Sequence, residues 1–189
     1  MKQPAITLIT GNPHKLRDIS DRIGLELLRR DINLPEIQST DVVEVATEKA
    51  KEAYARLGVP ILIDDASLTF NHWKTLPGAL IKFFMTNVGA NGLLDMLKGA
   101  EDRRCVMDCV LVYYDQEGPQ IFHGRTNGFV SEEVRGDHGW GYDTIVIPEG
   151  EEQTCAELTG EKYWHYSSRQ RAIDAFNVSA IRRRYDTQQ

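Results

Sequence analysis

The sequence of 189 residues predicts an α/β fold. Its first third alternates short apolar runs with amphipathic helical patterns, in the order strand, helix, strand, helix, strand. The segment 60–63 is apolar at every position, which is typical of a strand covered on both faces. From Cys105 onward, long alternating strands joined by a tight turn replace the helical patterns. Together these observations predict a sheet with helices packed against it.

The elements follow from local signals in order along the chain. Asn12 and Pro13 suit the start of a helix that Gly24 ends, and Gly58 suits the end of the next helix. The expected strands lie at 5–9, 25–28, 60–63, 105–114, 120–123, 129–130 and 145–147. The other expected helices lie at 41–57, 78–85, 91–98 and from Ser167 to about Arg184.

Composition restricts the class of protein. The formal net charge of −6 argues against binding along a nucleic-acid backbone. Met1–Pro4 leads into too short an apolar run for a signal peptide, and no run is long enough to span a membrane. Three cysteines without close pairing indicate a reducing compartment, so we expect a cytoplasmic protein without a disulfide framework. We expect one domain over residues 1–189.

The segment Thr10-Gly11-Asn12-Pro13-His14-Lys15 is the most informative part of the chain. It joins a buried strand to a helix, and Gly11 allows the backbone to approach a ligand closely. Free N–H groups at the helix start, with Lys15 in the first turn, form a site for an anion such as phosphate. An ordinary connection between a strand and a helix would explain the same pattern without a ligand.

Acidic residues supply the second part of the pattern. Asp64 and Asp65 are expected at the end of the third strand, where ligands of α/β sheets bind. Because adjacent strand residues point to opposite faces of the sheet, only one of the two aspartates needs to face the site. Carboxylates of this kind suit magnesium, and magnesium suits phosphates. A solvated turn is the alternative interpretation. Glu36 is either a second metal ligand or a loop acid.

Three further groups of residues have two interpretations each. Lys49 lies near the apolar face of its helix, where lysine usually extends toward solvent rather than into a pocket. Trp140, Tyr142 and Asp143 lie in a glycine-rich turn that either presents aromatic faces to a base or packs them in the core. Ser167 with Gln170 forms a capping box, and Arg169 could donate to a purine.

The ordered set of motifs resembles the inosine triphosphate pyrophosphatase family. The motifs are Thr10-Gly11-Asn12 with Lys15, Leu34-Pro35-Glu36, Asp64-Asp65 with Leu68, Leu76-Pro77-Gly78, Gly124-Arg125-Thr126, Gly139 to Asp143, Thr154 with Glu157, Lys162, and Ser167 with Arg169. Each motif is weak alone, but the order is specific and extends from Thr10 to Phe176.

The resemblance implies a long mixed central sheet flanked by helices, with the site in a cleft between two lobes, and a homodimer. It also implies Mg²⁺-dependent hydrolysis of nucleoside triphosphates, such as ITP, dITP and XTP, to a monophosphate and pyrophosphate. Neither a nucleic-acid polymer nor a membrane is expected as a partner.

The resemblance also implies roles for individual residues. Thr10, Gly11, Asn12, Lys15 and Lys49 would bind the phosphates. Glu36 and Asp65 would bind magnesium, and Asp65 or Asp64 would activate water, with Lys15 as a further catalytic group. Trp140, Tyr142 and Asp143 would frame the base, with Lys162, Ser167 and Arg169 closing on it.

The chain departs from the family pattern in its base-binding part. Ser168 stands where the family usually has histidine, and one extra residue separates Lys162 from Ser167, with His165 in that stretch. Asp18 and Thr144 replace the usual glutamate and proline. We therefore expect hydrolysis with altered or relaxed base choice. A nucleotide sensor that has lost turnover, or a same-fold phosphatase with another substrate, are the competing functions.

Overall fold

The computed structural model describes residues 5–186, so the predictions about Met1–Pro4 lie outside it. The strands are β1 (Thr7–Ile9), β2 (Leu28–Arg30), β3 (Ile61–Phe70), β4 (Pro77–Gly78), β5 (Arg104–Asp115), β6 (Gly118–Val130) and β7 (Val146–Pro148). The helices are α1 (Pro13–Ile23), α2 (Val42–Leu57), α3 (Ile81–Asn87), α4 (Gly89–Met96), α5 (Gly160–Tyr166), α6 (Ser168–Asn177) and α7 (Ala180–Asp186). Short 3₁₀ turns lie at Asn71–Trp73, Gly141–Thr144 and Cys155–Glu157.

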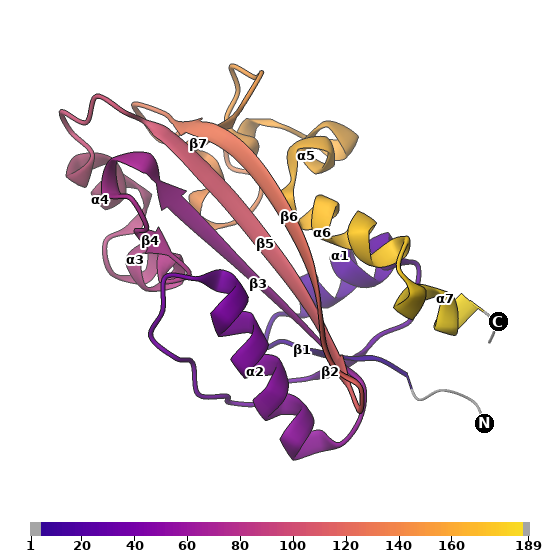
Figure 1. The fold of residues 1–189 in the computed structure, drawn as a ribbon. Helices are drawn as coiled ribbons and strands as arrows, with labels where there is room; N and C mark the ends of the chain where they lie inside the picture. Colours follow the sequence, from indigo (N-terminus) through magenta and orange to yellow (C-terminus); the bar gives the residue numbers. More distant parts are fainter. Residues whose placement is uncertain (1–4, 187–189) are drawn as a thin grey trace.

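The strands form one mixed sheet, which confirms the predicted fold class. The strand order is β2-β1-β3-β5-β6-β7, and β4 pairs with β3 outside this path. β1 runs parallel to β2 and β3, whereas β3, β5, β6 and β7 pair antiparallel. The long β3, β5 and β6 therefore form the body of the sheet, and the short parallel strands lie at one end (Figure 1).

Helices cover the two faces of the sheet differently. α2 lies across one face, where Ile61, Ile63 and Val110 pack against its apolar side. α1, α6 and α7 lie on the opposite face, against Leu62 and Leu111 (Figure 1). The alternation of neighbouring β3 residues between these two clusters follows from the two-residue period of a strand.

Two separate hydrophobic clusters share the face that carries α6. One contains α1, α6 and α7 with Leu62 and Leu111. The other contains α3 and α4 with Leu68 and Met107, further along the same two strands. Asp64 lies on β3 between Leu62 and Leu68, and the polar site described below occupies the space between the clusters. These clusters are the cores of the two expected lobes.

Two predicted strands differ from the observed ones. The second strand begins at Leu28, not at Leu25, because Leu25 and Leu27 pack into the core as the chain leaves α1. The prediction that Asp64 and Asp65 end the third strand is wrong, since β3 continues to Phe70. The continuous pairing of β3 with β5, from Ile61 with Tyr114 to Phe70 with Cys105, extends the strand through both carboxylates.

The C-terminal half also differs in detail. The segments predicted as strands at 120–123 and 129–130 belong to one strand, β6, which pairs with β5 over its whole length. The predicted single helix from Ser167 is two helices, because α6 ends at Asn177 and Ser179 begins a new turn by accepting a hydrogen bond from the Arg182 amide at 3.2 Å. α5 has no counterpart among the expected helices.

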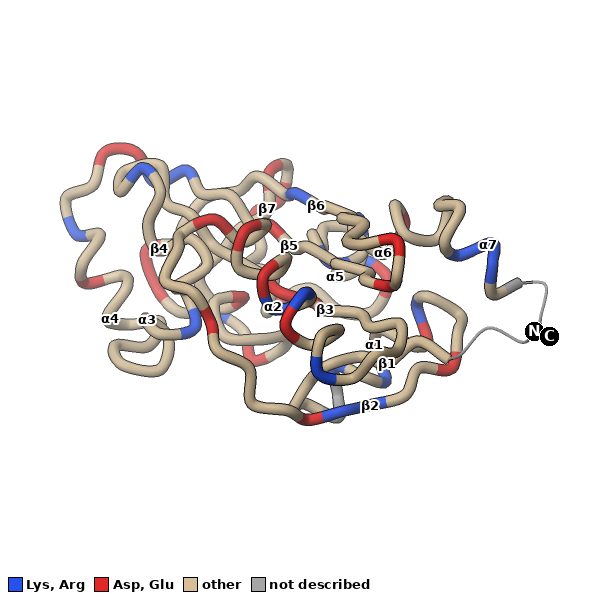
Figure 2. Tube along the Cα trace, turned by 60° about the horizontal axis from the view of Figure 1, so that its bottom comes forward, with Lys and Arg blue, Asp and Glu red and all other residues tan. Residues whose placement is uncertain are grey.

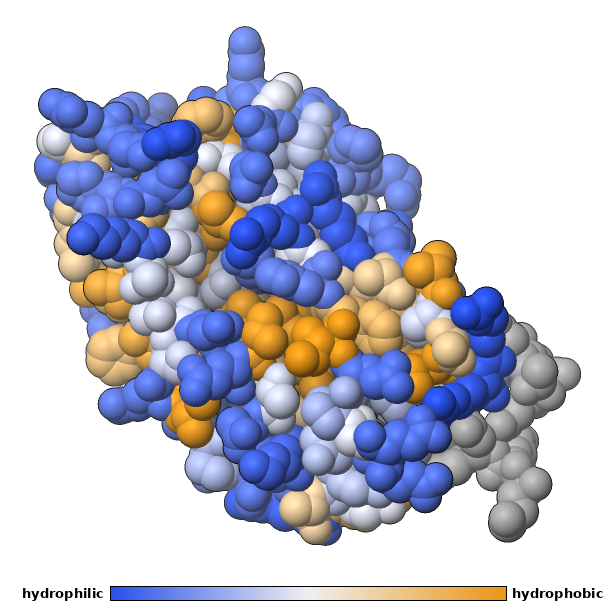
Figure 3. Space-filling view, in the orientation of Figure 1, coloured by the Kyte–Doolittle hydropathy of each residue, from blue (hydrophilic) through white to orange (hydrophobic). Residues whose placement is uncertain are grey.

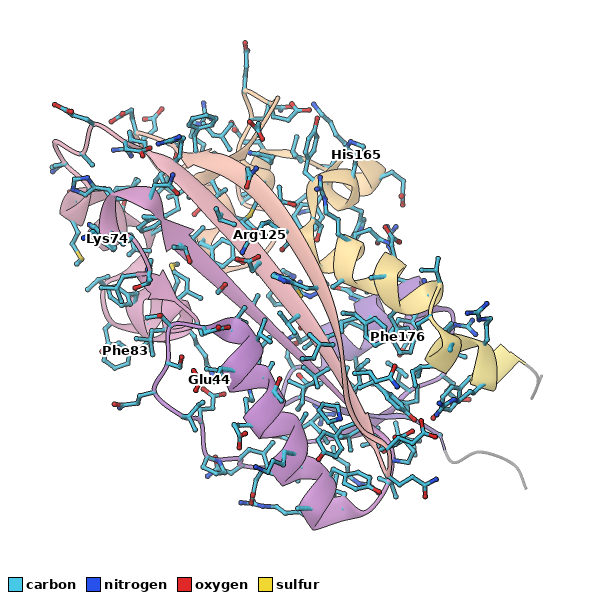
Figure 4. The ribbon with its side chains drawn as sticks, in the orientation of Figure 1. Glu44, Lys74, Phe83, Arg125, His165 and Phe176 are labelled. Carbon is cyan, nitrogen blue, oxygen red and sulfur yellow. The ribbon has the colours of Figure 1, made fainter. Side chains whose placement is uncertain are left out.

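Charged residues of both signs occur throughout the part of the chain that Figure 2 colours. Basic and acidic residues are interspersed along the chain (Figure 2). Hydrophobic residues gather on part of the face shown in Figure 3, and exposed apolar side chains on β6 include Ile121 and Phe129. Phe83 points away from α3, and Arg125 lies on the outer face of β6 (Figure 4). In residues 5–186, no helix is both long and apolar enough to cross a membrane.

Candidate active site

A cavity of about 770 Å³ lies between the two hydrophobic clusters. Polar and charged side chains from distant parts of the sequence line it. Of the predicted site residues, those lining it are Thr10, Gly11, Asn12, Lys15, Glu36, Lys49, Asp64, Asp65, Trp140, Tyr142, Asp143, Ser167 and Arg169. The fold thus brings together residues that are up to 159 positions apart, from Thr10 to Arg169.

The cavity forms at a gap along one edge of β3. β1 pairs with β3 only as far as Leu62, and β4 pairs from Leu68 onward. In the part of the chain that the structure describes, residues 63–67 have no partner strand on this side. Both faces of β3 therefore border one cavity here, so Asp64 and Asp65 both line it while pointing to opposite faces.

The loop after β1 forms one end of the cavity. The Asn12 amide donates to Thr10 Oγ1 at 3.0 Å, and the Lys15 amide donates to Asn12 Oδ1 at 3.4 Å. These bonds hold the loop at the start of α1, as the capping signals predict. A side chain at Gly11 would meet the Asp31 carboxylate at 3.2 Å, so glycine is favoured by the close packing there.

Asp64 is the centre of a buried ion cluster. Its side chain is fully buried and forms an ion pair with Lys15, whose ammonium also donates to the Asp64 carbonyl at the open edge of β3. Arg169 Nε and Cys109 Sγ donate to Oδ1 at 3.0 and 3.1 Å. Burial alone would raise the pKa of Asp64, but Arg169 and Lys15 hold it well below its usual range. Asp64 therefore remains ionised and linked to both ends of the cavity.

Asp65 belongs to a second cluster on the α2 side of the sheet. The Lys49 ammonium lies 2.8 Å from Glu36 Oε1 and 2.9 Å from the Asp65 carboxylate. Burial alone would lower the pKa of Lys49, but the two carboxylates raise it. The hydrogen bond from Lys49 lowers the pKa of Glu36. Lys49 thus points into the cavity, contrary to the usual behaviour of a lysine near an apolar helix face.

The donor set of this second cluster fits magnesium. Two carboxylates converge on a single cationic group, the ammonium of Lys49, and oxygen is the ligand that Mg²⁺ prefers. Within residues 5–186, no three His, Cys, Asp or Glu side chains form a metal-binding group. Mg²⁺ commonly takes only one or two protein carboxylates and completes its shell with water and substrate phosphates.

The glycine-rich turn forms the other end of the cavity. Gly139 and Gly141 have positive φ angles of 78° and 50°, and Trp140 between them is 43% exposed. Asp143 is buried and accepts hydrogen bonds from the Trp140 amide at 2.7 Å and the Tyr163 hydroxyl at 3.0 Å. Burial raises the pKa of Asp143, and the two hydrogen bonds oppose this rise only in part. Asp143 therefore stabilises the turn that presents Trp140.

α6 brings Ser167, Ser168 and Arg169 to the cavity. Ser167 caps the helix by accepting from the Gln170 amide at 3.4 Å, which is one half of the predicted capping box, whereas the Gln170 side chain donates to Asp174 instead of completing the box. The helix start lies directly on β6, because a Cβ at Gly124 would come within 2.0 Å of the Ser168 carbonyl oxygen. Only glycine at position 124 permits this approach, which places Arg169 next to Asp64.

Lys162 lies outside the cavity. Its ammonium pairs with Glu151 at 3.0 Å and donates to Gln153 at 3.2 Å, so its predicted contact with a substrate requires it to leave these partners. Sequence reasoning missed other lining residues, including Cys109, Lys82, Asp31 and Tyr163. Cys109 lies opposite Ala66 in the β3–β5 ladder, and only the strand register could have placed it beside Asp64.

The mixed sheet and this cavity define an α/β protein in which two lysines and three carboxylates, from distant parts of the sequence, line one cavity. The chain belongs to the Ham1 family, whose model matches residues 6–178.

Its relatives include a dITP/XTP pyrophosphatase of Methanopyrus kandleri, with 35% identity over 88% of this chain and 89% of the relative. Inosine triphosphate pyrophosphatase 2 of Trypanosoma cruzi is 36% identical over 92% of this chain and 90% of the relative. The structure of a HAM1 protein from Coxiella burnetii matches with a TM-score of 0.81 and 27% identity, over 92% of this chain and 96% of that one.

Proposed function

We propose that this protein hydrolyses non-canonical purine nucleoside triphosphates, such as ITP, dITP and XTP, to the monophosphate and pyrophosphate with Mg²⁺. The relatives named as dITP/XTP and inosine triphosphate pyrophosphatases support the substrate class. The observation that carries the proposal is the convergence of Glu36 and Asp65 on one cationic position, within the cavity that Lys15 also lines.

The phosphates bind at the start of α1 in this mechanism. Thr10, Gly11, Asn12 and Lys15 line the cavity at the start of α1, where the positive end of the helix dipole favours an anion. Lys15 and Lys49 add positive charge that offsets the charge of the triphosphate and of the leaving pyrophosphate. Bound at Glu36 and Asp65, Mg²⁺ would supply Lewis-acid stabilisation of the phosphoryl oxygens.

Asp65 rather than Asp64 orients the attacking water in this mechanism. Both carboxylate oxygens of Asp64 already have cationic partners, Lys15 and Arg169. A proton acceptor with so low a pKa is a weak base. Asp65 contacts one cation, Lys49, and its side chain is 21% exposed, so water can reach it. Asp64 acts as a positioning residue that holds Lys15 and Arg169.

The base binds at the opposite end, between the glycine-rich turn and α6. Trp140 offers an exposed aromatic face for stacking, and Tyr142 and Asp143 complete this wall. Ser167 and Arg169 line the same cavity, with Lys162 outside it. Ser168, in place of the usual histidine, supports a broader choice of base.

Pyrophosphate release from a panel of triphosphates tests the proposal. With Mg²⁺ present, we expect release from ITP, dITP and XTP in excess of that from ATP, CTP and dTTP. Absence of release from every triphosphate, despite measurable binding, would favour the sensor function and refute hydrolysis. Equal release from dATP, dTTP and ITP would refute selectivity for non-canonical purines.

We further propose that residues 1–189 act as one domain in a cytoplasmic homodimer. The three free, buried cysteines suit a reducing compartment. Light scattering coupled to gel filtration tests the dimer, since a monomer mass at micromolar concentration would refute it.

A further inference from the structure

The Lys49 ammonium forms ion pairs with both Glu36 and Asp65. Its distances to the two carboxylates are 2.8 and 2.9 Å, and its side chain is 15% exposed. Val45, Ala46 and Ala53, on the same face of α2, are buried against the sheet. The stem of Lys49 is thereby directed into the cavity rather than along the surface.

We propose that Lys49 is a resident counter-ion of the Glu36–Asp65 pair, which a divalent cation must displace in order to bind. This inference rests on the metal site of the proposed function. It adds that the Lys49 ammonium competes with free cations for the metal site.

Electrostatics supports this role. Two carboxylates that converge on one position repel each other unless a cation lies between them. Lys49 supplies that cation in the present structure and leaves the cluster with a net charge of −1. A divalent cation needs the lone pairs of the same carboxylate oxygens, and it repels the ammonium across a short distance. The two cations therefore compete for one position.

The displaced ammonium has another use in the same cavity. Lys15 and Lys82 also line it, so the released Lys49 adds a third ammonium to a region suited to several phosphate charges. A triphosphate that arrives with its metal ion would supply both the competing cation and new anionic partners for Lys49. A free metal ion supplies only the competing cation and no new partner for Lys49. The site should therefore bind the metal ion less tightly when no nucleotide is present.

Lys51 provides the matched control on the same helix. Its ammonium pairs with Glu48 at 3.4 Å, its side chain is 63% exposed, and it does not line the cavity. Lys51→Met removes the same charge at nearly the same place in the sequence without touching Glu36 or Asp65. Any general effect of reduced positive charge on cation binding would therefore appear in both variants.

The test measures Mn²⁺ binding without nucleotide, from the electron paramagnetic resonance signal of free Mn²⁺. We expect Lys49→Met to lower the dissociation constant at least about fivefold, and Lys51→Met to leave it within about twofold of the wild type. Glu36→Gln should raise the dissociation constant. Circular dichroism checks that each variant is folded, and Lys49→Gln replaces Lys49→Met if that variant is not.

The outcomes separate this proposal from the proposed function. If Glu36→Gln weakens Mn²⁺ binding but removal of the Lys49 charge does not strengthen it, the counter-ion proposal is overturned and the metal site stands. If Glu36→Gln leaves the affinity unchanged, the metal site itself is wrongly assigned, and both proposals fail.

Discussion

Asp64 and Asp65 are neighbours in sequence with opposite environments. Asp64 is fully buried among Lys15, Arg169 and Cys109, whereas Asp65 shares the half-buried Lys49 with Glu36. The two-residue period of β3 separates them, since each points to a different face of the sheet. The carboxylate of Asp64 therefore stabilises the fold, whereas in the proposed mechanism the carboxylate of Asp65 takes part in catalysis.

Asp65→Asn should abolish turnover and leave the fold intact. The amide cannot accept a proton from water and is a poor magnesium ligand, so we expect kcat to fall by about 10² to 10⁴. The urea midpoint should change little, because Asp65 is partly exposed. Asp95→Asn, on the exposed end of α4, is the matched control. A near-normal rate for Asp65→Asn would refute the assigned role.

Asp64→Asn should instead destabilise the fold, by about 3–5 kcal/mol, because it leaves Lys15 and Arg169 beside a neutral group in a buried place. Urea unfolding at pH 7 measures this loss. A variant as stable as the wild type would contradict the buried ion cluster.

The pH dependence of that loss has a definite sign. The pKa of Asp64 in the folded protein lies well below its usual value of about 3.9. Its contribution to stability is therefore complete above about pH 4 and is lost as the pH falls through the folded pKa. The difference in unfolding free energy between the wild type and Asp64→Asn should be constant from pH 7 to 5 and should become smaller below about pH 4.

At the scale of elements, the site depends on how closely α6 approaches β6. Gly124 lies under the first turn of α6, where a Cβ would meet the Ser168 carbonyl and the Ala172 amide at 2.0 and 2.5 Å. These neighbours are backbone atoms and cannot rotate away. The position of Arg169, at the start of α6, follows from this contact.

Gly124→Ala should therefore shift α6 and separate Arg169 from Asp64. We expect a loss of about 1–3 kcal/mol in unfolding free energy and a reduced kcat/KM. Asn127→Ala, at an exposed position of the same strand, should change neither quantity appreciably. Wild-type stability and activity in Gly124→Ala would show that the helix does not need this approach.

Local signals predicted several elements well and misplaced others. The C-cap of α2 at Gly58 is a local signal, and the structure confirms it, whereas Asp41, expected inside the helix, is its N-cap. The length of β3 depends on pairing with β5, whose partner residues are distant in sequence (from Ile61 with Tyr114 to Phe70 with Cys105), and no local pattern contains this pairing. The same non-local pairing makes β6 one strand.

At the scale of the molecule, the cavity separates two hydrophobic clusters on one face of a single sheet. The open edge of β3 between β1 and β4 makes room for it, and the ion cluster at Asp64 connects its two ends. A ligand that contacts Lys15 at one end and Trp140 at the other would therefore bridge both clusters.

A non-hydrolysable ITP analogue with Mg²⁺ should raise the melting temperature. At a ligand concentration of about 100 times Kd, binding contributes about 2.7 kcal/mol, or about 5–10 °C for a domain of this size. Differential scanning calorimetry measures the shift. Pyrophosphate with Mg²⁺ reaches only one end of the cavity, so at the same concentration it should bind more weakly and give a smaller shift. Equal shifts at equal concentration would contradict a ligand that spans the cavity.

The sequence by itself determined the α/β class, several helix caps and most of the predicted residues that line the cavity, because these depend on local patterns and on a specific order of motifs. Only the tertiary structure decided which environment, and hence which role, each of these residues has. It showed that Asp64 is saturated by two cations, that Lys49 points inward, and that Lys162 lies outside the cavity. The physical reason is that strand register, the gap beside β3 and the approach of α6 are long-range contacts, and these set the burial and the charged neighbours of each side chain.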